Sequence, residues 1–244
     1  MQTPDSPQPA ITLFQTLSLG LLVLVVYIFL QSSLLQHFAR AQLGDAADAK
    51  AMTDAMKSLV YDARVLSYLE IISGTLTTLF IVLLVHLRNV SPVEHLKLYR
   101  FQKRDLFSWL AVLAAFTILL ALVSSVLSPE SSDFMQRIWD STDNIILLII
   151  AIVIVAPIFE ETLFRGFLFT GIQQSHLGTG VAIGFTSATW AIIHTQYGAF
   201  DLVSIFVLGI VLSASRIASG SLLVPIILHG TFNFFAILEM AMFS

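Results

Sequence analysis

Long runs of apolar residues alternate with short polar segments along this 244-residue chain. A helix that crosses the hydrocarbon core of a bilayer needs about 20 mostly apolar residues. Seven runs meet or approach that length, and they predict membrane-spanning helices at about 11–31, 65–87, 106–127, 144–170, 178–195, 201–218 and 221–242. The fourth run is the longest, so part of it is expected to protrude, tilt or break, and an eighth short element has room within it. The pattern therefore predicts an all-α, polytopic membrane protein with a single integral membrane domain, 1–244.

The polar segments between these runs predict the topology. The segment 88–104 carries five Lys and Arg residues, whereas 128–143 carries only Arg137. Cytoplasmic loops are enriched in cations, so 88–104 is predicted to be cytoplasmic, and so is the N-terminus. Four cations before the second span, in 40–64, argue against this orientation. Acidic and apolar residues alternate at helical spacing in 42–64, which predicts a helix on the membrane surface or a solvated loop helix.

Composition narrows the classes of function. The chain is 57% hydrophobic and only 11% charged, with a net charge of -4 and a mean hydropathy of +0.87. So few charges give no basic surface for nucleic acid, and the bilayer is the expected environment. The chain has no cysteine, which excludes disulfides, thiolate metal sites and cysteine nucleophiles.

Ionisable and amide side chains at membrane depth are costly and mark candidate functional sites. They occur in five places: Glu160 and Glu161 with Arg165, His194, His229 with Asn233, Glu70, and Arg216. Glu70 is interpreted as a buried hydrogen-bonding carboxyl. Arg216 lies near a helix end, from which its side chain can extend to the interface.

Spacing indicates which of these groups can meet. Glu161 and Arg165 are four residues apart, which places an ion pair on one helical face. Glu160 is turned about 100° from Glu161 and is free to face elsewhere. This division suggests a structural Glu161 and a reactive Glu160. A purely structural ion pair remains an equal alternative.

Two later segments supply further polar groups. His229 and Asn233 are also four apart, so that two donors on one face can hold an oxyanion. His194 ends a run in which Gly180, Gly184 and Ala188 would allow close helix packing. Helix–helix hydrogen bonding is the alternative for a single membrane histidine.

Four motifs resemble those of the CPBP family, the CAAX prenyl proteases and bacteriocin-processing enzymes also called the ABI family. The segment EETLFR, 160–165, resembles the family's E-E-x-x-x-R, and WAIIH, 190–194, resembles F-x-x-x-H. The segment 206–221 is similar to F-x-x-G-x-x-x-G-x-x-x-x-x-T-G-S, and HGTFN, 229–233, to H-x-x-x-N. The motifs cover about 157–235. Trp190, Ser213 and Ser219 replace the usual Phe, Gly and Thr, all at packing positions.

The resemblance implies an intramembrane peptidase of roughly eight helices around a conical cavity. Its core would be about 144–242, preceded by the N-terminal helices in about 11–127. By resemblance, Glu160 and His194 activate water, His229 and Asn233 hold the oxyanion, and Glu161 with Arg165 order the site. The expected partners are a peptide or protein substrate at the membrane and the lipid bilayer, in a bacterial inner membrane with the active site toward the cytoplasm.

Alternatives remain open. No cofactor is expected, but a zinc ion bound by Glu160, His194 and His229 is a second mechanism. A non-catalytic immunity or regulatory protein would use the same cavity for binding. A transporter would also carry intramembrane charges, although no inverted repeat is visible. The sequence predicts neither the substrate nor the oligomeric state.

Overall fold

The computed structural model describes residues 11–44, 48–127 and 133–243, and the regular elements in these residues are all helical. The predicted cytoplasmic N-terminal residues 1–10 lie outside this description. The elements are α1 Leu13–Leu43, α2 Ala49–Leu59, α3 Ala63–Leu87, α4 Pro92–His95, α5 Lys103–Leu127, α6 Asp133–Asp140, α7 Ile145–Ile149, η1 Ile150–Val155, α8 Ala156–Glu161, η2 Thr162–Leu168, α9 Phe169–Gln173, α10 Gly178–Ile192, α11 Ala199–Ser219 and α12 Leu223–Phe243.

Six helices in the described residues are long and apolar enough to span a bilayer. They are α1, α3, α5, the continuous helix Ile145–Gln173, α11 and Leu223–Met242 of α12. The prediction of a polytopic helical membrane protein is confirmed. The count of seven to eight spans is not confirmed, because the run expected at 178–195 forms a helix of only 15 residues, α10. The polar segment after α1 forms α2, which has no buried residue.

The fourth span is one helix with two π-helical segments, η1 and η2. Pro157 lies two residues after the end of η1 and has no backbone N–H, so one carbonyl about a turn earlier loses its usual partner. Extra residues per turn of this kind are frequent at functional sites. The expected irregularity in this span is therefore a local widening of the helix at both sides of Glu160 and Glu161.

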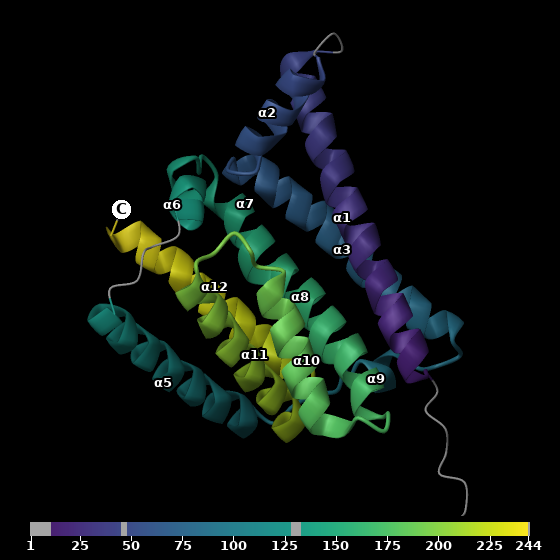
Figure 1. Ribbon diagram of the computed structural model, residues 1–244. Coiled ribbons are helices and arrows are strands. Elements are labelled where there is room, and N and C mark those ends of the chain that lie inside the picture. Colours follow the sequence, from purple (N-terminus) through teal and green to yellow (C-terminus); the bar gives the residue numbers. More distant parts are fainter. Residues whose placement is uncertain (1–10, 45–47, 128–132, 244) are drawn as a thin grey trace, which may run out of the picture.

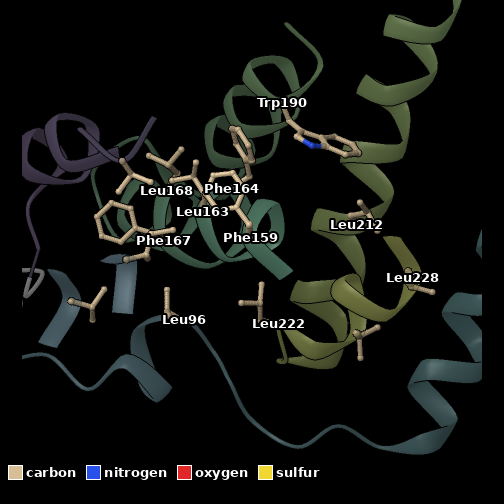
Figure 2. Close-up of a cluster of buried hydrophobic side chains, with 14 of the residues drawn as sticks. Leu96, Phe159, Leu163, Phe164, Phe167, Leu168, Trp190, Leu212, Leu222 and Leu228 are labelled. Atoms are coloured by element: carbon tan, nitrogen blue, oxygen red, sulfur yellow. The ribbon is translucent and has the colours of Figure 1, made fainter. Parts of the chain in front are cut away.

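The helices form a bundle whose two edges differ (Figure 1). The pair α1 and α3 packs side by side at one edge, and α5 lies at the other edge against α11 and α12. Between them, the helix Ile145–Gln173 is surrounded by α3, α10 and α12. The main core joins Phe159, Leu163, Phe164 and Phe167 of this helix to Trp190 of α10 (Figure 2). Phe159 and Phe164 of this core are the sequence neighbours of Glu160 and Arg165, so the core lies directly beside these predicted site residues.

The face that α10 buries differs from the expected one. Ala182, Thr186 and Trp190 are buried, whereas a Cβ added at Gly180 or Gly184 would have no neighbour within 4 Å. Positions two residues apart are about 200° apart on a helix, so the glycine face is turned away from the core. The prediction that these glycines mediate close packing is wrong.

A second correction concerns Arg216, which does not extend to the interface. Its side chain is only 3% exposed, and its guanidinium lies 4.4 Å from the ring centroid of Phe169. It donates a hydrogen bond to the Thr170 hydroxyl, which in turn donates to the carbonyl of His95 over 2.9 Å. Arg216 therefore ties α11 to α9 and to the connection before α5.

His95 makes the fold sensitive to acid. Burial, then the charges of Arg216 and Lys97, lower the pKa of His95 from 6.5 to about 4. The unfolded chain takes up a proton near pH 6.5 and the folded protein does not, so stability is complete above pH 6.5 and falls toward pH 4. The loss is about 3 kcal/mol. Thermal unfolding in detergent at both pH values should reveal it in the wild type and in His37→Gln, an exposed control. An equal acid loss in His95→Gln would contradict this assignment.

Candidate active site

Trp190 on α10 joins most of the predicted site residues. Its indole N–H donates a hydrogen bond to Glu160 Oε2 on α8. Its ring lies 5.4 Å from the His194 ring and 5.1 Å from the His229 ring, centroid to centroid. The Arg165 guanidinium lies 4.3 Å from the same ring centroid. The structure thus brings Glu160, Arg165, His194 and His229 together around one aromatic side chain.

A buried ionic network joins Arg165, Glu161 and His229. Arg165 Nη1 donates to Glu161 Oε1 over 2.9 Å, and both side chains are 0% exposed, so the expected ion pair is present. The same oxygen lies 3.0 Å from His229 Nδ1. Because a carboxylate oxygen can only accept, His229 Nδ1 carries a proton in this contact. Glu161 therefore orients both a guanidinium and an imidazole, and it is turned away from Glu160 as predicted.

His194 presents a free ring nitrogen. Its Nδ1 lies 2.7 Å from the main-chain oxygen of Trp190, one turn earlier. A carbonyl oxygen is an acceptor only, so Nδ1 carries the proton, and the neutral ring has its lone pair on Nε2. A half-buried imidazole of this kind can accept a proton from a bound group.

Asn233 is held by the irregular helix. Its Nδ2 donates to the carbonyl oxygen of Ile152 over 2.9 Å. That carbonyl lies five residues before Pro157, in the turn that lacks one N–H donor because of the proline. The Asn233 amide thus repairs a backbone defect with one N–H and keeps a second N–H, one helical turn from His229. In the described residues, the Asn233 side chain bonds Ile152 and not Glu160 or His194.

The position of α12 depends on Gly230. A Cβ added there would lie 2.6 Å from the carbonyl oxygen of Val153, so Gly230→Ala must push α12 away from η1. Overpacking of this kind costs about 1–3 kcal/mol. We expect at least a tenfold loss of any activity as well, because His229 moves with the helix. Gly180→Ala is the matched control, since nothing lies near an added Cβ there. Equal unfolding temperatures and equal reaction rates for Gly230→Ala and Gly180→Ala would show that Gly230 does not determine the position of α12.

Tyr197 lies next to His194 in the connection after α10. The two rings stack with centroids 6.1 Å apart. The pKa of the Tyr197 phenol is raised above its ordinary value by burial, then by the negative charges of Glu160 and Asp201. Tyr197 therefore stays protonated and can donate a hydrogen bond beside His194.

The depth of the site differs from the expected one. Glu160 lies near the middle of the helix Ile145–Gln173, not toward its predicted cytoplasmic end. Five Lys or Arg residues lie in the segments at each end of the bundle (Figure 1): Arg88, Lys97, Arg100, Lys103 and Arg104 at one end, and Arg40, Lys50, Lys57, Arg64 and Arg137 at the other. With the cations divided equally, the charge rule does not choose between the two orientations.

The possible metal ligands do not converge. In the described part of the chain, His, Asp and Glu side chains form no group of three that could hold a metal ion. Glu160 Oε2 faces Trp190, and His229 Nδ1 faces Glu161. As arranged, Glu160, His194 and His229 do not fit a zinc site, which needs three or four converging ligands.

Trp190 has a role that was not predicted from the sequence. It is more than a size-matched replacement for Phe, because only Trp has the N–H that bonds Glu160. The signal was available, since a buried indole N–H needs an acceptor. The other two replacements do pack as expected: Ser213 and Ser219 each bond a main-chain oxygen one turn earlier on α11.

Comparisons with known proteins identify the family of the chain. The family described as "Type II CAAX prenyl endopeptidase Rce1-like" matches residues 142–235, which include every residue discussed above from Ile152 to Asn233. An Escherichia coli relative named "Uncharacterized 24.3 kDa protein" is 32% identical over 172 residues, which are 67% of this chain and 76% of the relative. No solved structure matches the chain. Together with the four motifs, these matches show that the chain belongs to the Rce1-like family of type II CAAX prenyl endopeptidases within the CPBP family.

Proposed function

We propose that the protein is an intramembrane endopeptidase that hydrolyses a peptide bond with water activated by Glu160. The observation that carries the proposal is the arrangement around Trp190. The half-buried carboxylate of Glu160 and the imidazole of His194 both contact this residue, next to the buried ion pair of Glu161 and Arg165. Each of these polar groups carries a cost of insertion into the membrane, which supports a functional role for the cluster. Family membership supports a protease that acts at a membrane.

The reaction follows from the donors and acceptors. Glu160, assisted by Nε2 of His194, removes a proton from water, and the hydroxide oxygen bonds to the carbonyl carbon of the substrate. The carbonyl oxygen becomes an oxyanion, which His229 and the second N–H of Asn233 stabilise. The carbon–nitrogen bond then breaks, its electron pair stays on nitrogen, and the proton held by Glu160 passes to that nitrogen. The products are a carboxylate and an amine.

This assignment requires a specific charge state. Nδ1 of His229 already donates to Glu161, so His229 can donate to an oxyanion only from a protonated Nε2. Ionised Glu160 and Glu161 with Arg165 sum to one negative charge. A protonated His229 brings the sum to zero, which suits a site at membrane depth.

Metal-dependent hydrolysis is the alternative mechanism. Glu160, His194 and His229 would have to turn toward one another to bind zinc. Purified protein treated with 1,10-phenanthroline separates the two mechanisms: unchanged cleavage supports water activation by Glu160 alone, whereas a loss that added zinc restores supports the metal.

The substrate proposed is a membrane-bound peptide, with or without a prenyl group. An apolar groove of about 440 Å³ runs between α8 with η1 and α12, beside Gly230. Such a groove suits an apolar substrate segment. We propose an inner-membrane location in bacteria; the orientation with 88–104 and the N-terminus cytoplasmic needs its own test, because the cations at the two ends of the bundle are equal in number. Single cysteines at Lys103 and Thr195 in this cysteine-free chain, labelled from each side, would establish the orientation of the site.

The test of function uses purified protein in liposomes. A prenylated CAAX peptide and its unprenylated counterpart are incubated with the wild type and with Glu160→Gln, and the products are identified by mass spectrometry. We expect a new carboxyl terminus from at least one peptide with the wild type only. Binding of peptide with no cleavage, or equal biological complementation by Glu160→Gln, would favour the non-catalytic alternative.

A further inference from the structure

A polar network joins α1 to α3 outside the part of the chain that the family match covers. The Tyr27 hydroxyl donates to Glu70 Oε2 over 2.6 Å. Gln31 Nε2 donates to the Tyr27 oxygen over 2.8 Å and to Ser73 Oγ over 3.0 Å. Both helices are membrane spans, so the carboxyl and its partners carry an insertion cost that the site described above does not explain.

This network packs directly on the helix that carries Glu160. The Tyr27 ring stacks on the ring of Phe159, with centroids 4.5 Å apart and an interplanar angle of 18°. Phe159 is the residue before Glu160. The hydrogen bond from Tyr27 to Glu70 fixes the ring that covers Phe159, so the network reaches the proposed base in two contacts.

Gly74 allows α3 to approach closely at this point. A Cβ added at Gly74 would lie 2.9 Å from Glu70 Oε1, 3.0 Å from Val155 Cγ1 and 3.6 Å from Phe159 Cβ. Figure 1 shows α1 and α3 side by side along the edge of the bundle next to α8. Because no side chain separates the backbones, Glu70 lies at the contact between α3 and the segment Val155–Phe159.

Glu70 also interacts with the site through the charge of Glu160. Its Oε1 is buried and has no hydrogen-bond partner in the described residues. Both Glu70 and Tyr27 interact with the charge of Glu160. The other titratable or charged groups around Glu160 come from its own helix, α10 and its connection, and α12: Glu161, Arg165, His194, Tyr197 and His229.

We propose that Glu70 is a positioning residue, which holds Tyr27 against Phe159 and thereby fixes Glu160 in the orientation that accepts a proton from water. The inference rests on the proposed function and assigns a role to the N-terminal helices α1 and α3. A displacement of about 1 Å at a reacting group can cost a hundredfold in rate. The loss of one anchoring hydrogen bond, with the stacked ring kept, is expected to cost less.

Kinetics with matched variants separates positioning from bulk packing. Tyr27→Phe keeps the stacked ring and removes the hydrogen bond, and Glu70→Leu removes the acceptor. Each should lower kcat about tenfold with KM within twofold of the wild-type value. Glu70→Gln retains an acceptor oxygen for Tyr27 and should keep kcat within threefold. Glu239→Gln, at an exposed glutamate of α12, is the control and should match the wild type.

A second measurement does not require activity. Trp190 is left as the single tryptophan in a Trp109→Phe, Trp139→Phe background. Its emission reports the hydrogen bond to Glu160, and Glu160→Ala defines the spectrum without that bond. Tyr27→Phe and Glu70→Leu should shift the emission toward this spectrum, and Glu70→Gln should not.

Three outcomes would overturn the inference. They are wild-type kcat and emission in both Tyr27→Phe and Glu70→Leu, an equal loss in Glu70→Gln and Glu70→Leu, and a rise in KM with kcat unchanged. A wild type that cleaves no peptide would contradict the proposed function instead, and the emission of Trp190 would then decide the positioning role alone.

Discussion

Glu160→Gln should reduce kcat/KM for peptide cleavage by about a hundredfold to ten-thousandfold, which is the usual contribution of general-base catalysis. The amide oxygen of glutamine can still accept the indole N–H, so the fold should keep its unfolding temperature. The amide cannot accept a proton from water at neutral pH. The expected result is therefore a folded protein without activity.

Kinetics and thermal unfolding on the same preparations check this prediction. Glu239→Gln makes the same chemical change at an exposed glutamate of the same chain and should retain full activity. If Glu160→Gln cleaves substrate as fast as Glu239→Gln does, Glu160 is not the base. A loss of activity that follows a loss of fold would assign Glu160 to structure.

Arg165→Met should have the largest effect on stability, a loss of about 3–5 kcal/mol. Arg165 and Glu161 are both 0% exposed, so removal of the guanidinium leaves a buried carboxylate with His229 as its remaining partner. The contact of the guanidinium with the Trp190 ring is lost too. Replacement of both charges in Arg165→Met, Glu161→Gln should recover part of the loss, because no unpaired buried charge remains.

An exposed ion pair supplies the control. Arg64 pairs with Asp143, and the two side chains are 60% and 47% exposed. Exposed pairs contribute about 0–1 kcal/mol, so Arg64→Met should unfold close to the wild-type temperature. Equal unfolding temperatures for Arg64→Met and Arg165→Met would show that the buried pair does not hold the site together.

Contacts within one helix could be predicted from spacing. Four-residue spacing predicted the pair of Glu161 and Arg165, because 3.6 residues per turn fix which side chains of a helix meet. The spans, the helix after α1 and the membership in a membrane protease family also follow from apolar runs and motif order. The spans and the contacts within one helix depend only on the helix geometry and on the bilayer, and neither requires knowledge of how one segment packs against another.

Contacts between helices could not be predicted, because they depend on how the helices are rotated and how close they pack. The bond from Trp190 to Glu160, the stack of Tyr27 on Phe159 and the burial of Arg216 are of this kind. The length of α10 was missed for the same reason, since an apolar run does not record where tertiary contacts end a helix. Asn233 is a further example. Its spacing from His229 on the same helix could be read from the sequence, but its hydrogen bond to the carbonyl of Ile152 on another helix could not.

A double-mutant cycle shows whether Glu160 and His194 act on one water molecule. The kcat/KM values of the wild type, Glu160→Gln, His194→Gln and the double variant are measured with the same peptide in liposomes. The effects of residues that act as a unit are strongly non-additive, so the double variant should be no slower than the slower single variant. A double variant whose loss equals the product of the two single losses would contradict the shared water and assign the two side chains independent roles.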